Sequence, residues 1–305
     1  MNTFDKALLA ALTDIDGIGD ARAYELYSHF DDPGSLVDVP DSLADTYHYV
    51  TSSTLAEIRS LEERIDEYQQ CFQAYEESGI TILGIEDDQY PAEIRDGPAP
   101  ALLYARGDLE HLTSDSIGVS GSRETNDDGR LWIKEISMDL TGESCAIVSG
   151  GARGADTAAH EGALASTGAT IVVLGTGINV PYPPENSDLF NEILDAGGLL
   201  ISMRPPDAEP ERHAFIDRNE LIAALSNAMI FVATDGTGGT MAQYRMALEY
   251  DRPVFIPPAD LDIQPRDGLE ELREFNETDV IDHVGDIPTE LPTSKSQQMN
   301  LDDWS

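Results

Sequence analysis

The chain has 305 residues, of which 41% are hydrophobic; this excludes a broadly disordered protein and allows about two domains of ~100–200 residues. Its formal net charge is −40 with acidic residues spread along the chain, which favours adaptation to concentrated salt over an acidic interaction protein that repels nucleic acid. Two cysteines are too few for a disulfide framework. The N-terminus does not resemble a signal peptide and no apolar run approaches ~18 residues, so we expect a cytoplasmic protein with no membrane segment.

Residues 1–75 are expected to form an acidic, helical N-terminal domain, with helices over 7–13, 21–30 and 54–77. The turn between the first two helices has the Gly17-x-Gly19 spacing of a helix-hairpin-helix motif. In that motif the N–H groups of the hairpin contact a DNA phosphate. A purely structural hairpin is the alternative, because three aspartates surround the turn.

Residues 76–262 alternate short apolar runs with helical patterns. Strands are expected over 80–85, 101–104, 117–120, 146–149, 170–174, 199–201, 229–233 and 254–256. Helices are expected over 129–140, 155–167, 187–196, 218–226 and 240–249. This alternation predicts an α/β fold with a doubly wound, mostly parallel, Rossmann-like sheet.

Three of these strands are followed by loops rich in glycine, serine or threonine, and such loops present backbone N–H groups to phosphate. Because the carboxyl ends of parallel strands share one edge of a sheet, we expect the three loops to meet there. The candidate phosphate-binding residues in them are Gly121, Ser122, Arg123, Ser149, Gly150, Gly151, Arg153, Gly154, Gly238, Gly239 and Thr240.

Arginines gather near the same loops, although the chain is strongly acidic. Five of the nine basic residues between positions 115 and 258 lie in or beside the loops, and arginine suits phosphate because its fork donates two parallel bonds. They are Arg123, Arg153, Arg204, Arg212 and Arg218.

Each of these assignments has a structural alternative. Arg153 and Arg123 either bind phosphate or form an internal ion pair with Asp156 or Asp127. Phe215 either stacks on a base, which is worth ~1–3 kcal/mol, or anchors the following helix in the core. Asn219 is expected to cap or brace its loop rather than to read a base.

Residues 263–286 are expected to form a small C-terminal extension with one more small helix over 263–285, and residues 287–305 a linker and tail peptide. In the tail, Gln298, Leu301 and Trp304 resemble a sliding-clamp-binding box, in which Leu301 and Trp304 would share one face of a helical turn. Another partner, such as a recombinase, and a disordered or self-docked tail are the alternatives.

The order of these motifs resembles the DNA-processing protein A family (DprA, also called Smf) over roughly residues 8–260. The chain departs from the family pattern at Ser202-Met203-Arg204-Pro205, where a Ser-Glu-x-Pro stretch is usual, and its C-terminal segment is too short for the winged helix of many members. The matching segments are Tyr90-Pro91, Gly121-Ser122-Arg123, 149–156, Ala159-His160, Tyr182-Pro183, Phe215-x-x-Arg218-Asn219, Gly238-Gly239-Thr240 and 253–257.

The resemblance implies single-stranded DNA binding, protection of that DNA and loading of a RecA-type recombinase. It also implies a homodimer formed through the sheet domain. It implies no enzymatic activity. We accordingly expect no catalytic residues and no cofactor, and the scattered histidines predict no metal.

Two other functions stay open: a nucleotide-binding sensor, and an N-glycosidase like the LOG family, which hydrolyses nucleoside monophosphates. Those enzymes carry a catalytic Glu after a Gly-Gly-x-Gly-Thr loop, whereas here no carboxylate follows the loop at 238–240 until Glu249. General acid–base catalysis at that loop therefore lacks its group. His160 is expected to make a structural hydrogen bond, and the histidines show no metal-ligand spacing.

Overall fold

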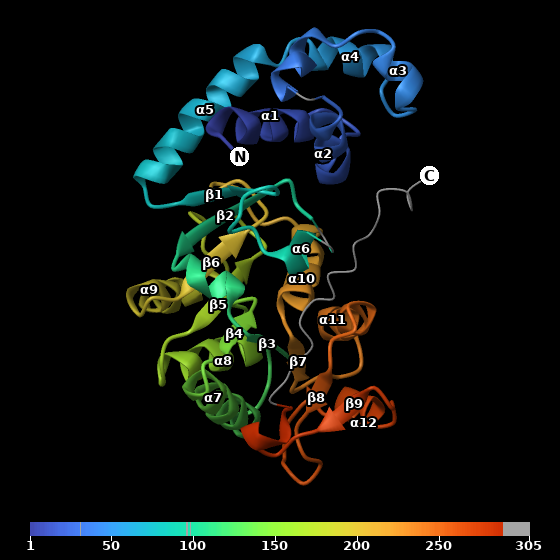
Figure 1. Cartoon of the computed structure of the whole chain (residues 1–305). Coiled ribbons are helices and arrows are strands. Elements are labelled where there is room, and N and C mark those ends of the chain that lie inside the picture. The colour runs from blue at the N-terminus through green and yellow to red at the C-terminus, as the bar shows by residue number, and fades with distance from the viewer. Residues whose placement is uncertain (31, 96, 98, 289–305) are drawn as a thin grey trace.

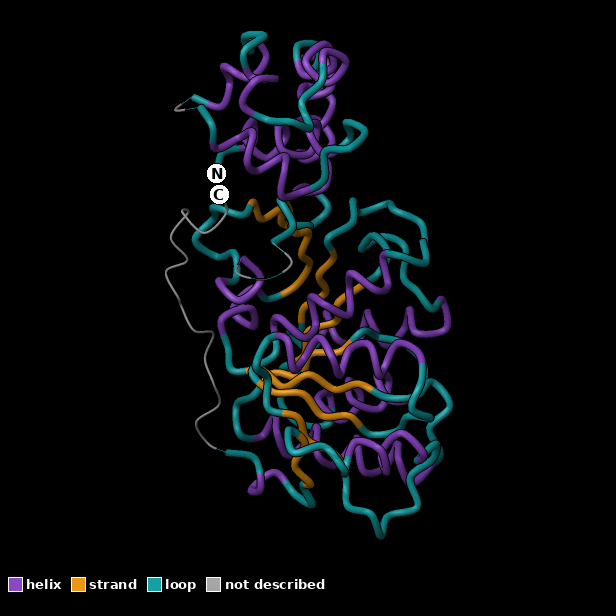
Figure 2. Tube along the Cα trace, turned by 90° about the vertical axis from the view of Figure 1, so that its right-hand side faces the viewer, coloured by secondary structure: helices purple, strands orange, loops and turns teal. Residues whose placement is uncertain are grey.

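The computed structural model describes residues 1–30, 32–95, 97 and 99–288 (Figure 1). A helical N-terminal segment packs at one end of a nine-stranded sheet, and further helices flank that sheet (Figures 1 and 2). None of the described helices has the length and apolarity that crossing a bilayer requires. The tail residues Gln298, Leu301 and Trp304 lie outside the described residues.

The N-terminal segment confirms the helices expected over 7–13 and 21–30, but the single helix expected over 54–77 is wrong. The first helix of this region ends at Ile58 and the next begins at Glu62. Between them, the Arg59 guanidinium donates from Nε to the Val39 carbonyl (3.0 Å). The break lets Ile58 and Leu61 both reach the core. The segment consists of α1 (Thr3–Thr13), α2 (Asp20–Ser28), the 3-10 helix η1 (Pro33–Asp38), α3 (Leu43–Thr46), α4 (Ser52–Ile58) and α5 (Glu62–Glu77).

The sheet has the strand order β1-β2-β6-β5-β4-β3-β7-β8-β9. Neighbouring strands from β6 to β9 are parallel, whereas β1 and β2 are antiparallel to each other and β2 is antiparallel to β6. The strands are β1 (Thr81–Gly84), β2 (Leu102–Gly107), β3 (Ser116–Ser120), β4 (Ala146–Ser149), β5 (Thr170–Leu174), β6 (Leu199–Ser202), β7 (Ala228–Phe231), β8 (Val254–Ile256) and β9 (Thr278–Val280).

Helices cover both faces of the parallel part, so the predicted doubly wound α/β fold is confirmed (Figure 1). On one face α7 (Asp127–Gly142) and α8 (Ala155–Leu164) pack over β3 and β4, and α9 (Ser187–Asp195) packs on β6. The other face carries α10 (Ala214–Leu225) and α11 (Gly238–Glu249). The shorter helices are α6 (Ala92–Arg95), η2 (Leu109–Thr113), η3 (Pro184–Asn186), α12 (Asp267–Leu272) and η4 (Val284–Asp286).

The chain reverses its direction of travel across the sheet at β3. It runs outward from β3 to β6 and then returns to place β7 on the other side of β3, which right-handed crossovers allow only if the helices change face. The loops that follow β3 and β7 therefore start side by side but lead to helices on opposite faces of the sheet. In doubly wound sheets such a point leaves a crevice in which ligands bind.

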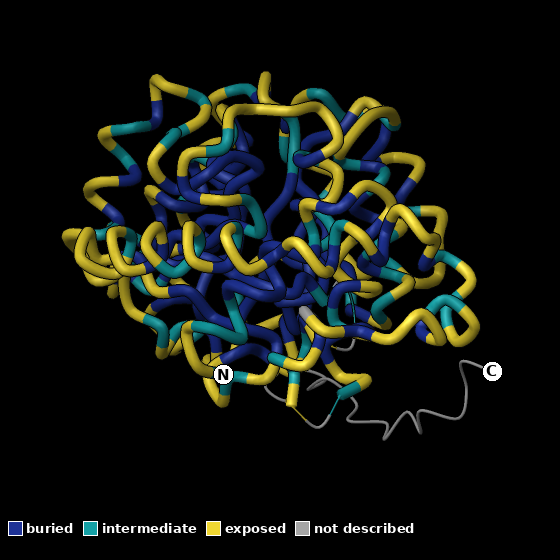
Figure 3. Tube along the Cα trace, turned by 90° about the horizontal axis from the view of Figure 1, so that it is seen from above, coloured by how far each residue is buried: buried dark blue, intermediate teal, exposed yellow. Residues whose placement is uncertain are grey.

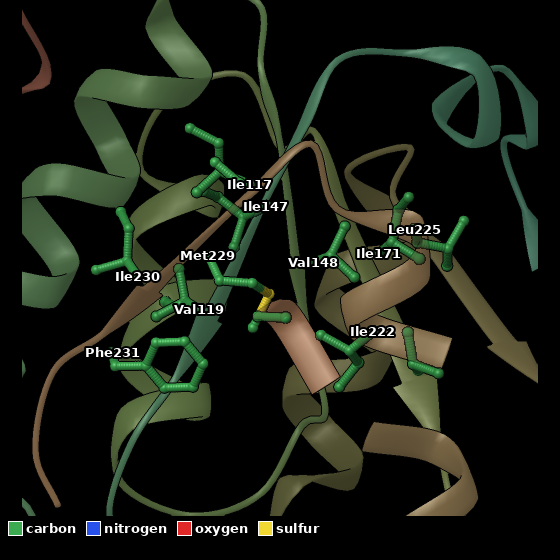
Figure 4. Close-up of a cluster of buried hydrophobic side chains, with 14 of the residues drawn as sticks. Ile117, Val119, Ile147, Val148, Ile171, Ile222, Leu225, Met229, Ile230 and Phe231 are labelled. Atoms are coloured by element: carbon green, nitrogen blue, oxygen red, sulfur yellow. The ribbon is translucent and has the colours of Figure 1, made fainter. Parts of the chain in front are cut away.

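The core of the parallel sheet is apolar and closely packed. Val148 and Met229 lie with Leu225 of α10 on one face of the sheet, whereas Ile117, Ile147 and Ile230 point to the opposite face (Figure 4). Seen from above, the buried residues lie inside a rim of exposed residues (Figure 3). This packing holds the ends of the parallel strands in fixed positions.

A second apolar cluster joins the N-terminal helices to β1, β2, β5 and β6. The ring of Phe72 on α5 meets that of Tyr104 on β2 edge-on, with 6.4 Å between centroids. At the hairpin, the Asp20 carboxylate accepts a bond from the Ala101 N–H (2.8 Å), which ties one of the three aspartates to the segment just before β2. Burial raises the pKa of Asp20.

Polar bonds also tie the N-terminal segment to loops of the sheet. The Tyr75 hydroxyl donates to Asp207 (2.9 Å), which accepts a second bond from the Asn179 amide (2.8 Å). Arg106 in turn donates to Asn179 (2.9 Å). The chain of bonds connects α5 with β2 and with the loops that follow β5 and β6.

Residues after 262 contribute more regular structure than the small helix expected there. The helix exists as α12, and β9 then adds a ninth strand beside β8. The sheet thus continues into the segment 263–286. β9 is only three residues long and carries acidic Asp279, so it gives no clear alternation by which a strand is recognised.

Candidate nucleic-acid interface

Three loops meet at the carboxyl ends of β3, β4 and β7, and we call the surface that they form the loop face. The Ser122 N–H donates to the Ala233 carbonyl after β7 (2.7 Å), and the Ala155 N–H donates to the Ser122 carbonyl (3.2 Å). Gly154 has φ +77°, and a Cβ there would lie 2.5 Å from the Ser122 carbonyl oxygen. A glycine is therefore required for the loops after β3 and β4 to touch.

Arg218, on α10, lies directly against Gly150. A Cβ on Gly150 would lie 0.9 Å from Nη1 of Arg218, so only glycine leaves room for this guanidinium. The guanidinium lines a cavity of about 120 Å³ at the loop face. The cavity is lined by Arg123, Gly150, Ala152, Arg153, Tyr182, Pro183, Pro184, Glu185, Phe215 and Arg218.

Arg218 is paired with Asp156 but is not fully bonded. Its Nη1 lies 3.8 Å from the Asp156 carboxylate, and the two side chains are 7% and 12% exposed. Among the described residues, Nε of Arg218 has no hydrogen-bond partner. Burial raises the pKa of Asp156, against the opposing effects of Arg218 and of the Ala152 and Gly150 N–H groups. Burial disfavours the charged form of Arg218 too, and so lowers the pKa of its guanidinium.

The rim of the cavity carries two exposed arginines, Arg123 and Arg153. Arg153 does not take the expected alternative partner, Asp156, which pairs with Arg218 instead. It lies 3.6 Å from the Glu185 carboxylate, and both side chains are more than half exposed. An exposed pair of this kind is worth about 1 kcal/mol or less, so an incoming anion can displace the carboxylate.

Phe215 stands at the cavity with one side covered. A Cβ on Gly175 would lie 2.6 Å from its ring, so the ring rests on the backbone at the end of β5. The ring of Tyr182 lies 5.3 Å away between centroids and is tilted by 51°. Phe215 is partly buried and also lines the cavity, so base stacking and anchoring of the helix both stay predictions.

The third loop ends at the amino terminus of α11. Thr237, at the N-cap, makes no side-chain capping bond to the first N–H groups of α11, which begins Gly238-Gly239-Thr240. The Asn219 amide approaches Gly239, 3.6 Å from where a Cβ would lie. Asn219 thus lies beside this loop, and its bracing role stays a prediction.

Other predicted residues lie beneath or beside the cavity. The Ser149 hydroxyl is fully buried and donates to the Val119 carbonyl (2.7 Å), which joins β4 to β3. Gly151 is buried with φ +65°, and a Cβ there would lie 2.7 Å from the Phe190 ring. Gly121 also packs inward, where a Cβ would lie 2.8 Å from that of Ala155.

Arg204 and Arg212 do not line the cavity. Arg204 lies 3.1 Å from Glu211, and that carboxylate also lies 3.2 Å from His213. Arg212 is exposed next to these residues. Of the five arginines that the sequence indicated, three thus line the cavity and two do not.

Two residues of the site were not among the predicted site residues. Tyr182 had no signal beyond its Tyr-Pro pair, yet it is 38% exposed at the cavity. Asn186 braces the glycine-rich loop, because its amide donates to the Gly151 carbonyl (2.9 Å) and to the Thr157 hydroxyl (3.0 Å). An asparagine just before a helix is ordinarily expected to be a cap.

His160 makes the structural hydrogen bond expected of it. It is fully buried, and burial lowers its pKa to about 3. The Thr170 hydroxyl donates to the Ile147 carbonyl, so the His160 Nδ1–H donates to Thr170 (2.8 Å). Within the described residues, no group of three or more His, Cys, Asp or Glu side chains is arranged to hold a metal ion.

Comparison with known proteins gives consistent matches. The model of the family described as DNA recombination-mediator protein A matches residues 81–292. Protein Smf of Synechocystis sp. is 34% identical over 230 residues, which are 72% of this chain and 58% of that protein. The chain therefore spans less than two thirds of the length of this curated relative.

Two solved structures extend the similarity to the fold. The X-ray structure of DNA processing protein A from Streptococcus pneumoniae has a TM-score of 0.75 and 26% identity, and the match covers 96% of this chain and 99% of that one. DNA processing protein A from Helicobacter pylori has a TM-score of 0.60 and 29% identity over 68% of this chain and 93% of that one. A unique single-stranded DNA binding mode is described for the Helicobacter pylori protein.

Proposed function

Since this chain belongs to the DNA recombination-mediator protein A family, we propose that it binds single-stranded DNA at the loop face and acts without catalysis. The single-stranded DNA binding mode described for the Helicobacter pylori protein supports this ligand. In this proposal the 120 Å³ cavity takes a phosphate and the adjoining rings take a base.

The observation that carries the proposal is the state of Arg218. A guanidinium that is 6% exposed and has an unbonded Nε is costly to bury, because a buried donor without a partner costs about 1–3 kcal/mol. Asp156 balances its charge, and Gly150 leaves it open toward the cavity. A phosphate oxygen in the cavity would give this guanidinium a close acceptor, which Asp156 at 3.8 Å from Nη1 does not provide.

Base stacking provides affinity for single-stranded DNA that ion pairs lose in concentrated salt. For single strands log K falls by ~0.7 per phosphate contact per decade of salt, so about five contacts lose about 10⁴-fold or more over a roughly twentyfold rise in salt. A binder in concentrated salt therefore depends on direct hydrogen bonds and on rings such as Phe215 and Tyr182. Each base stacked on an aromatic ring contributes ~1–3 kcal/mol.

The first turns of α11 favour binding over N-glycosidic hydrolysis. Gln243 stands in the second turn of this helix, and its side-chain oxygen accepts a bond from the buried Ser120 hydroxyl (2.8 Å). Glu185, the carboxylate among the residues described at the cavity, is engaged with Arg153. A nucleotide-sensing module is the second candidate, because the small cavity and its adjoining rings would also receive a single free nucleotide.

Fluorescence anisotropy in molar KCl tests the proposal with a single-stranded oligonucleotide, a duplex and a mononucleotide as ligands. We expect the single strand to bind tightest. We expect Arg153→Ala to weaken that binding while thermal unfolding stays unchanged. Tight mononucleotide binding without oligonucleotide binding would favour the sensor and rule out the DNA proposal.

Partners are proposed on family membership. We expect a homodimer formed through the sheet domain, loading of a RecA-type recombinase, and a cytoplasmic location where the proposed ligand is found. Light scattering at micromolar concentration tests the first of these. A strict monomer in high salt would refute the dimer.

The tail is proposed to bind a sliding clamp through Gln298, Leu301 and Trp304. Calorimetric titration of the 291–305 peptide into the cognate clamp should give binding that Trp304→Ala abolishes. Absence of heat at high peptide concentration, or binding that survives the substitution, would exclude the clamp as the partner.

A further inference from the structure

A groove of about 540 Å³ runs between α7 and α8, next to the loop face. Arg123 and Arg153 line both this groove and the 120 Å³ cavity, so the two spaces share one rim. At the other end the helices close on each other, since a Cβ on Gly162 would lie 2.4 Å from the Lys134 carbonyl oxygen. The groove thus leads from the loop face along two helices.

The charge of the groove is opposite to that of the chain. It is lined by four of the 18 basic residues but by only two of the 58 acidic residues, Glu124 and Glu161. Arg130 and Lys134 add to the two shared arginines, and they stand one helical turn apart, about 6 Å along α7. In a protein of net charge −40, this reversal indicates an anionic ligand.

The remaining lining indicates which part of a polyanion fits. Among the residues described at the groove there is no aromatic ring on which a base could stack. Leu131, which is 57% exposed, and Ala158 also line the groove, so part of its wall is apolar. Cations at the spacing of a helical turn beside an apolar wall suit a sugar–phosphate backbone, with its bases pointing to solvent.

We propose that this groove is the second segment of a continuous single-stranded DNA track. It would hold the backbone of nucleotides that flank the one bound over Arg218. The inference depends on the proposed DNA binding at the loop face and adds the path of the strand. Lys134 lies 3.3 Å from Glu161 across the two helices, and this exposed pair would open when a phosphate enters.

Arg130→Gln tests the track, with Arg245→Gln as the matched control. Both arginines are exposed residues on helices, and both substitutions remove one positive charge, but Arg245 lies on α11 away from the groove. Anisotropy is measured with single strands from about 4 to about 16 nucleotides, a range typical of single-strand sites.

Native protein should bind the longer strands more tightly than the shortest. Arg130→Gln should leave the shortest strand unaffected and weaken the longest by about threefold, as expected for an exposed ion pair. It should also make the slope of log K against log salt shallower by ~0.7 for the longest strand, and Arg245→Gln should do neither.

Three outcomes would overturn the track. They are equal effects of the two substitutions at every length, no gain of affinity with length in the native protein, and an equal loss on the shortest strand after Arg130→Gln. Each leaves binding at the loop face standing. If the native protein binds no single strand of any length, the proposed function itself fails.

Discussion

Gly150→Ala should displace the Arg218 guanidinium from the cavity. The new Cβ would lie 0.9 Å from Nη1 and 2.2 Å from Cζ, so the guanidinium must move by about 2.5 Å to regain van der Waals distance. The Nη1–Asp156 distance is already 3.8 Å, so a shift of that size separates the pair.

Two measurable losses follow from this displacement. A hydrogen bond to a charged group is worth about 1.5–3 kcal/mol, so single-strand affinity should fall by about 10- to 100-fold. Breaking a buried ion pair costs about 3–5 kcal/mol, which we take as an upper limit because the flexible arginine can move out to solvent. Anisotropy measures the first loss, and urea unfolding in high salt the second.

Gly142→Ala is the matched control. This glycine lies in the last turn of α7, and a Cβ there meets only the Ser166 hydroxyl, at 3.6 Å. The control should bind DNA as the native protein does. If folded Gly150→Ala also retains native affinity, Arg218 is not a ligand and the assignment of the cavity is refuted.

Three further outcomes are expected. Glu185→Gln should tighten single-strand binding by about twofold to fivefold, because it frees Arg153 from an exposed ion pair, and unchanged anisotropy would contradict this. Phe215→Leu should weaken binding by the ~1–3 kcal/mol of a stacked base, whereas unaltered affinity would make the ring purely structural. Arg218→Met should raise the pKa of Asp156 still further. A carboxyl whose folded pKa lies above its unfolded value destabilises the fold as pH rises. The variant's stability deficit in urea should therefore grow as pH rises above the ordinary pKa of aspartate, and a deficit that shrinks would refute the pairing.

The parallel sheet was predictable because its strands are short apolar runs bounded by glycine-rich loops. β4 and β5 lie at the predicted residues, and the loops meet as the shared carboxyl edge requires. The ends of helices were less certain, as in α8, which stops at Leu164 rather than continuing to residue 167. Such ends depend on packing that local sequence does not contain.

Sequence predicted which residues belong to the site better than it predicted how they pair. Sequence placed Arg153 and Arg218 in the same region, but not which of them Asp156 pairs with. That choice depends on Gly150, whose missing side chain makes room for one guanidinium only. Arg130 and Lys134 carried no motif, since a basic pair on an acidic helix normally indicates a solvated face.

The junction between the N-terminal helices and the sheet bears on how this chain can be dissected. Tyr104, Leu102 and Leu200 are buried within the cluster that those helices complete. A fragment beginning after α5 would present this apolar surface to water and leave Asp207 without the Tyr75 hydroxyl. Because contiguous apolar surfaces of this kind drive aggregation, a truncated fragment would need compensating polar substitutions before its behaviour could be attributed to the loop face.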